Sequence, residues 1–165
     1  MKLTIYILPL LASLPALAST QKVATRVSLG RPAHRSLYRQ EISEAARRAS
    51  LDPKLVEAVI AVESNYSRKA VSPKGAQGLM QVIPSTQAEC GIAEPYHTVN
   101  HLMGATECLR KLINRFRGNL KLALAAYNAG TGAVTKYNGI PPYRETREYV
   151  KKVLGTYHRL RRNPG

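Results

Sequence analysis

The sequence predicts an all-α domain, or one that is nearly all-α, and two patterns support this. From about residue 36 onward, apolar residues recur at intervals of three and four, the spacing that lines one face of a helix. Residues that start and stop helices separate these runs, and no internal repeat or strand-rich block interrupts them. The glycine-containing stretch at residues 75–81 is the one place where a short β-hairpin is expected.

Two helices are expected first. The earlier one is amphipathic and presents the apolar residues Leu37, Ile42, Ala45, Ala46 and Ala49. The next begins at Asp52 and Pro53, because Asp caps helix N-termini and Pro fits the first helical position. It runs to about residue 65 and carries Glu63 near its C-terminal end.

Five further helices are expected downstream. Pro84 begins a short one, Gly118 and Asn119 separate two longer ones, and Gly130 ends the second of these. The expected helices cover about residues 84–89, 100–117, 120–128, 132–137 and 145–160.

The N-terminus has the pattern of a secretory signal peptide. Lys2 precedes an apolar stretch that ends in a small-x-small cleavage pattern, so residues 1–18 are expected to be removed after Ala18. A membrane anchor or a core helix is the alternative. Pro9, Pro15 and the short length argue against an anchor, since a spanning helix needs about 20 apolar residues. Export, in a bacterium to the periplasm, is therefore expected.

The expected domain organisation follows from composition. Residues 19–35 are polar, basic and aperiodic, and read as a flexible lead-in. Residues 36–160 form the one domain that a chain of 165 residues can support. Residues 161–165 form a basic tail. We expect a monomer.

The net charge of +15, from 25 basic and 10 acidic residues, favours anionic partners. Nucleic acid is not expected, because the protein is exported and no nucleic-acid motif occurs. Bacterial cell wall, whose peptides carry many carboxylates, fits better. A charge that serves only solubility is the alternative.

The two cysteines, Cys90 and Cys108, are an even number in an oxidising compartment, which predicts one disulfide. Two buried thiols are the alternative. Together with four scattered histidines they show no metal-ligand spacing, so neither a metal nor a cofactor is implied.

Glu63 is the principal candidate for catalysis. It follows an apolar helical run, and burial raises the pKa of a carboxyl group, as a general acid at neutral pH requires. The next residue, Ser64, can hydrogen-bond to this carboxylate or to a sugar. Alone, a glutamate at a helix end is more often a surface residue.

A tight loop of Gly78, Leu79, Met80 and Gln81 follows. The Gln81 amide offers donors and an acceptor that suit sugar hydroxyl and acetamide groups. The alternative is an ordinary turn in which Leu79 and Met80 fill the core.

A third segment contains Ala126, Tyr127 and Asn128 before the helix stop at Gly130. The phenol offers a donor and a flat face for a pyranose ring, and the amide can recognise an N-acetyl group. The alternative is a helix C-terminus with a buried tyrosine.

The fourth segment contains Glu145 and Tyr149, which share one helix face. Tyr149 could approach Glu63 and tune its pKa. Glu145 could cap its own helix or bind a sugar. An exposed pair is the alternative for both.

In this order, the four segments resemble the catalytic domain of soluble-type lytic transglycosylases, which are lysozyme-like enzymes that cleave peptidoglycan. The resemblance covers residues 36–157. It implies an α+β lysozyme-like fold and a catalytic acid/base at Glu63. It also implies a glycan groove lined by Gln81, Tyr127, Asn128 and Tyr149. The cysteine pair departs from the general pattern.

A single carboxylate favours a non-hydrolytic route. Asp52, the only aspartate, lies about 16 Å away at the far end of the same helix. The resemblance implies cleavage between N-acetylmuramic acid and N-acetylglucosamine that leaves 1,6-anhydro ends. It also makes secretion, conjugation or pilus machines candidate partners.

Three alternatives remain open. A hydrolytic lysozyme would use Glu145 or Glu148 as its second carboxylate. A peptidoglycan-binding assembly module would lack catalysis. A cationic membrane-active protein would need helices unlike these, which read as core-facing.

Overall fold

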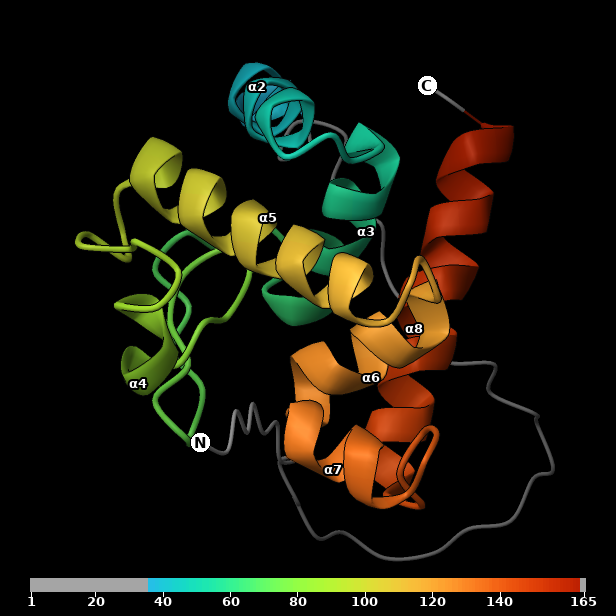
Figure 1. Ribbon diagram of the computed structural model, residues 1–165. Coiled ribbons are helices and arrows are strands. Elements are labelled where there is room, and N and C mark those ends of the chain that lie inside the picture. Colours follow the sequence, from blue (N-terminus) through green and yellow to red (C-terminus); the bar gives the residue numbers. More distant parts are fainter. Residues whose placement is uncertain (1–35, 164–165) are drawn as a thin grey trace, which may run out of the picture.

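The computed structural model describes residues 36–163, and these form a helical domain (Figure 1). In chain order the helices are α2 (Arg39–Arg48), α3 (Pro53–Glu63), α4 (Pro84–Gln87), α5 (Thr98–Arg115), α6 (Leu120–Ala129), α7 (Thr131–Lys136) and α8 (Arg144–Arg162). The all-α class is therefore confirmed. The expected signal peptide, the lead-in and the last two residues of the tail lie outside the described residues.

The helix boundaries follow from local capping. The Asp52 carboxylate accepts a 2.8 Å hydrogen bond from the Lys54 amide and so begins α3, as predicted. The Asn119 side chain caps α6 in the same way, and Gly130, with φ of +84°, ends it. His97 caps α5, so this helix begins two residues earlier than expected. Helix α8 continues beyond its expected end to Arg162.

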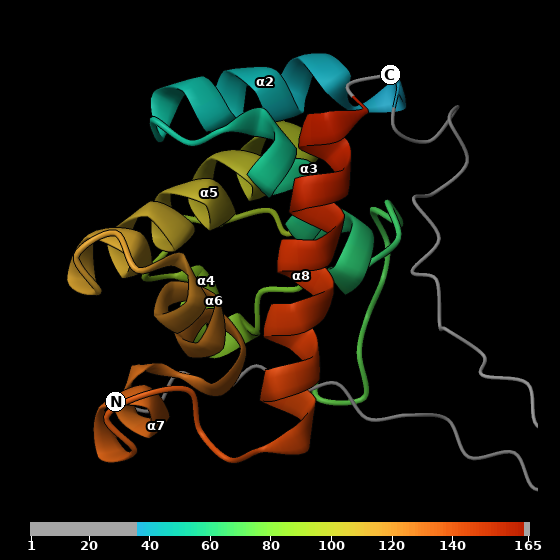
Figure 2. The same ribbon diagram turned by 90° about the vertical axis from the view of Figure 1, so that its right-hand side faces the viewer.

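Helix α5 runs through the middle of the domain (Figures 1 and 2). It packs between α2 on one side and α6 on the other, while α8 packs across both α3 and α6. Apolar side chains from these five helices share one core. Helix α3, which ends at Glu63, therefore packs directly against α8.

The segment between α3 and α4 is irregular. Two isolated antiparallel bridges, Val71 with Gln77 and Gln77 with Val82, occur where a short hairpin was expected. No residue between 64 and 83 belongs to a strand. Gln81 has a φ of +52°, so the backbone turns sharply at this residue.

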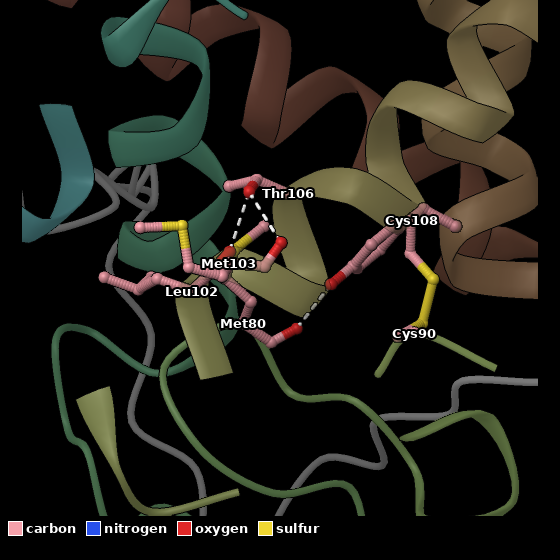
Figure 3. The surroundings of a disulfide bond; sticks show 7 residues. Met80, Cys90, Leu102, Met103, Thr106 and Cys108 are labelled. Atoms are coloured by element: carbon pink, nitrogen blue, oxygen red, sulfur yellow. Dashed lines mark hydrogen bonds between the residues drawn. A yellow bond between two sulfur atoms is a disulfide. The ribbon is translucent and has the colours of Figure 1, made fainter. Parts of the chain in front are cut away.

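A disulfide joins Cys90 to Cys108, as predicted, and attaches the loop after α4 to α5. Figure 3 shows it beside α5, where the Thr106 hydroxyl donates to the carbonyls of Leu102 (2.7 Å) and Met103 (3.1 Å). Across residues 36–163 the helices are too short or too polar to cross a bilayer.

Candidate active site

Glu63 is a buried carboxyl group at the end of α3, and its side chain is only 9% exposed. Neither carboxyl oxygen has a hydrogen-bond partner among the described residues. Burial raises the pKa of Glu63 to about 8, the nearby charge of Glu145 adds to the rise, and the Tyr149 hydroxyl opposes it. Glu63 therefore carries its proton at neutral pH, as a general acid must.

Two buried tyrosines from different helices face this carboxyl group. Burial and the charge of Glu63 hold the pKa of both phenols, Tyr127 of α6 and Tyr149 of α8, well above the ordinary value. Both are therefore neutral donors. The Tyr149 hydroxyl has no hydrogen-bond partner among the described residues, and it is available to a newly charged Glu63 or to a ligand.

The Tyr127 hydroxyl, unlike that of Tyr149, already has a hydrogen-bond partner. It donates a 2.8 Å hydrogen bond to the carbonyl oxygen of Met80. The phenol therefore fixes the loop of residues 78–81 to α6, although its charge coupling to Glu63 places it beside the carboxyl group.

The loop of residues 78–81 is held by its neighbours. Leu79 and Met80 are fully buried in the core. The Ser64 hydroxyl donates to the Leu79 carbonyl at 2.8 Å. The Gln81 amide nitrogen donates to the carbonyls of Gly78 (2.9 Å) and Ala70 (3.1 Å). In this state both polar side chains shape the loop, and their predicted contacts with a sugar stay predictions.

Asn128 lies at the end of α6, directly after two buried residues, Ala126 and Tyr127. Its Oδ1 accepts a 2.8 Å hydrogen bond from the Thr146 hydroxyl of α8. Its Nδ2 is buried without a hydrogen-bond partner among residues 36–163. This arrangement leaves a donor unused, which suits the predicted recognition of an N-acetyl carbonyl.

The two candidate second carboxylates differ in position. Glu145, in the first turn of α8, lies close enough to Glu63 for its charge to raise the pKa of that group. Glu148 is exposed, and it accepts a 2.8 Å hydrogen bond from Arg144. Only Glu145 therefore remains a candidate partner for Glu63.

Two polar residues of the site were not singled out from the sequence. Thr146 lies between Glu145 and Tyr149, and its role depends on a contact 18 positions away along the chain. His101 lies four and eight positions before Ala105 and Leu109, two apolar residues that share its face of α5. That spacing was the signal that could have identified it as buried.

His101 is 1% exposed, and its Nε2 accepts a 3.0 Å hydrogen bond from the Met80 amide. Burial lowers its pKa to about 4, so the ring is neutral at physiological pH. The ring packs directly against Gly78, where φ is +78°. A Cβ there would lie 2.6 Å from both His101 Cε1 and the Pro95 carbonyl oxygen, so only glycine fits.

The comparison with known families agrees with this geometry. Residues 40–150 match the model of the Transglycosylase SLT domain. The chain belongs to this family. The predicted resemblance is thereby confirmed, and the lysozyme-like fold expected from it is found in solved structures of the same family.

Three known proteins are similar to this chain. The "Transglycosylase" of Enterobacteria phage PRD1 is 32% identical over 126 residues, which cover 76% of this chain and 45% of the phage protein. "Lysozyme g" of Takifugu rubripes is 30% identical over 144 residues, which cover 78% of this chain and 76% of the fish protein. The structure of an inactive mutant of lytic transglycosylase Slt from Pseudomonas aeruginosa superposes with a TM-score of 0.66.

The Slt structure is 30% identical and is matched over 73% of this chain but only 23% of its own. The chain thus spans less than half the length of the phage protein and about a quarter of Slt. The common part is the SLT domain, and it contains every residue of the site described above.

Proposed function

We propose that the protein is a peptidoglycan lytic transglycosylase that cleaves the β-1,4 bond between N-acetylmuramic acid and N-acetylglucosamine without adding water. The observation that carries the proposal is the buried, protonated carboxyl group of Glu63, which lies inside an SLT domain. A glycosidic oxygen is a weak base, and it leaves readily only when an acid protonates it in the transition state.

In the first step, Glu63 donates its proton to the bridging oxygen and the bond from this oxygen to C1 of N-acetylmuramic acid breaks. N-acetylglucosamine leaves with a new hydroxyl group. The substrate's own N-acetyl group stabilises the positive charge that develops at C1. The unused Nδ2 of Asn128 is a suitable donor for holding an N-acetyl carbonyl near the site.

In the second step, the Glu63 carboxylate accepts the proton of the C6 hydroxyl group, and O6 forms a bond to C1. The product is a 1,6-anhydro ring, and Glu63 has regained its proton. The Tyr149 hydroxyl, unpartnered in this state, can donate to Glu63 while the carboxylate is charged.

A hydrolytic muramidase is the second candidate, and two observations favour it. "Lysozyme g" of Takifugu rubripes matches over most of its length. In addition, the charge of Glu145 acts on Glu63, so a second carboxylate is present near the first. In a hydrolase, Glu145 would activate a water molecule that attacks C1.

The products distinguish the two reactions. Purified peptidoglycan is digested with the protein lacking residues 1–18 and analysed by mass spectrometry, with Glu63→Gln as the matched variant. The proposal expects 1,6-anhydro-N-acetylmuramic acid ends that are absent with Glu63→Gln. Reducing ends, heavier by one water, would establish the muramidase. A folded protein that binds peptidoglycan but never cleaves it would support the non-catalytic module.

For the cellular role, we infer a periplasmic enzyme that opens the wall for an envelope-spanning secretion, conjugation or pilus system. The resemblance drawn from the sequence supports this inference. Deletion of the gene and complementation with wild type or Glu63→Gln tests it. Assembly of the machine should depend on the intact glutamate, whereas a defect in bulk wall turnover alone would indicate a general role.

A further inference from the structure

Met80 is held through both polar groups of its backbone. Its amide donates to Nε2 of His101 on α5 at 3.0 Å, and its carbonyl accepts from the Tyr127 hydroxyl of α6 at 2.8 Å. Both side chains are buried, with exposures of 1% and 2%. A buried imidazole thus connects through one residue to a phenol that neighbours Glu63.

The direction of the Tyr127 proton matters for the chemistry. A phenol has one proton to donate. While that proton points at the Met80 carbonyl, it cannot point at the Glu63 carboxyl group, whose two oxygens have no hydrogen-bond partner among the described residues. A donor aimed at Glu63 would stabilise its charged form and so weaken it as an acid.

We propose that His101 is a positioning residue for the acid step. By accepting a hydrogen bond from the Met80 amide, it holds the Met80 carbonyl where this carbonyl accepts the hydrogen bond of the Tyr127 hydroxyl. The phenol is thereby kept from donating to Glu63. The inference rests on the proposed role of Glu63. His101 touches neither the substrate bond nor Glu63 and acts only through Met80 and Tyr127.

The close packing around the ring supports a fixed position. Gly78 lies directly against His101, so the imidazole cannot tilt without moving the loop of residues 78–81. Since Nε2 accepts the hydrogen bond from the Met80 amide, the ring proton of the neutral tautomer lies on Nδ1, which has no partner among the described residues. The unsatisfied Nδ1–H group costs free energy in the folded state, and the same tautomer is the one that lets Nε2 accept from the Met80 amide.

The test measures the Glu63 pKa directly, by NMR titration of carboxyl-labelled glutamate, with the signal assigned by its absence in Glu63→Gln. The ionisable groups that face Glu63 are Tyr127, Tyr149 and Glu145, and none of them is altered by a change at His101. His101→Leu removes the acceptor. The freed Tyr127 hydroxyl should then donate to Glu63 and lower its pKa by about one unit or more. The pH at which kcat falls on the alkaline side of its pH profile should decrease by the same amount.

Three comparisons separate positioning from a general packing defect. His101→Gln offers an amide oxygen as acceptor and should restore the Glu63 pKa. Thr106→Val removes another buried hydrogen bond of α5 and should leave the Glu63 pKa unchanged. In a Tyr127→Phe background, His101→Leu should cause no further shift, because no phenolic proton remains.

An unchanged Glu63 pKa in folded His101→Leu would overturn the proposal, and so would an equal shift in the Tyr127→Phe background. If His101→Leu does not fold, the Glu63 pKa measured in Tyr127→Phe tests the proposal by itself. The proposal expects it to leave the Glu63 pKa unchanged, whereas a rise of about one unit would show that the phenol already donates to Glu63. A wild-type protein that cleaves nothing would contradict the proposed function and would leave these titrations interpretable.

Discussion

The Thr146 hydroxyl donates to Oδ1 of Asn128 across the contact between α8 and α6, at 2.8 Å. Both side chains are 2% exposed, so the bond fixes which way the amide faces and leaves Nδ2 as the unused donor. Thr146→Val keeps the shape and removes this bond. We expect KM for peptidoglycan fragments to rise by about fivefold, since such a bond contributes about 1 kcal/mol.

Thr146→Ser is the matched control for this prediction, because it keeps the hydroxyl group and loses only a methyl group. Its KM should stay near that of the wild type. Binding of uncleaved fragments to Glu63→Gln, with and without Thr146→Val, measures the same effect without turnover. Equal affinity in both would show that the orientation of Asn128 does not matter for the ligand.

The raised pKa of Glu63 makes the protein less stable as the pH rises. Its pKa is about 8 in the folded state and has an ordinary value of 4.5. Between these values the folded state keeps a proton that the unfolded state has lost. Stability therefore falls through this window, with a limiting slope of about 1.4 kcal/mol per pH unit, and the loss is complete above pH 8.

Glu63→Gln has no proton to lose, so it should lack this slope. Denaturant unfolding from pH 5 to 8.5 measures the free energy of unfolding of both proteins. The value for Glu63→Gln should increase relative to that of the wild type as the pH rises, by at least about 2 kcal/mol at pH 8. Glu148→Gln, at an exposed position, serves as the control and should show no such gain. Parallel curves for wild type and Glu63→Gln would show that the carboxyl group is not buried in solution.

Tyr149 is expected to act on the charged form of Glu63. Its hydroxyl lowers the pKa of Glu63 against the larger effect of burial. Tyr149→Phe should therefore raise this pKa further and move the alkaline limb of the kcat profile upward. It should also slow the step in which Glu63 is charged by at least about tenfold, since a hydrogen bond to a charged group contributes about 1.5–3 kcal/mol.

The pH dependence of kcat measures both effects of Tyr149→Phe. The exposed Tyr96 offers a control, and Tyr96→Phe should leave the profile unchanged. A downward move of the alkaline limb in Tyr149→Phe would mean that the phenol does not stabilise the carboxylate.

Local signals in the sequence were enough to predict most of the fold. Asp52, Asn119 and Gly130 mark helix ends by capping chemistry that acts within a few residues, and the helices begin or end where these residues predict. The start of α5 was placed two residues too late because its cap is His97, a rare capping residue that gives no clear signal in the sequence. The expected hairpin reduces to two bridges, and Gln81, with a φ of +52°, turns the backbone within the loop that the second bridge closes.

The site was predicted less completely than the fold. Motif order gave Glu63 and its neighbouring segments, yet it could not say which polar groups already have partners. The Ser64 hydroxyl, the Gln81 amide and the Tyr127 phenol all bond to backbone carbonyls around the loop of residues 78–81. Such bonds depend on tertiary distances, and no spacing along the chain encodes them. Thr146 escaped notice for the same reason.

Gly78 and Gly75 form a matched pair that tests the packing of the site. Both have a φ of +78°, but a Cβ at Gly75 would meet nothing within 4 Å, while one at Gly78 would clash with His101 and the Pro95 carbonyl. Gly75→Ala should therefore cost only the backbone strain, about 1 kcal/mol. Gly78→Ala should cost clearly more, about 3 kcal/mol in unfolding free energy, because a closely packed site must also open.

Activity should separate the two glycine variants more strongly than stability does. The loop that Gly78 begins holds Met80, so a displaced loop moves the carbonyl that Tyr127 needs, and kcat should fall at least tenfold in Gly78→Ala while Gly75→Ala stays near wild type. Denaturant unfolding and product formation at a temperature where both variants are folded measure this difference. Equal costs in the two variants would mean that the loop rests more loosely on His101 than the contact at Gly78 indicates.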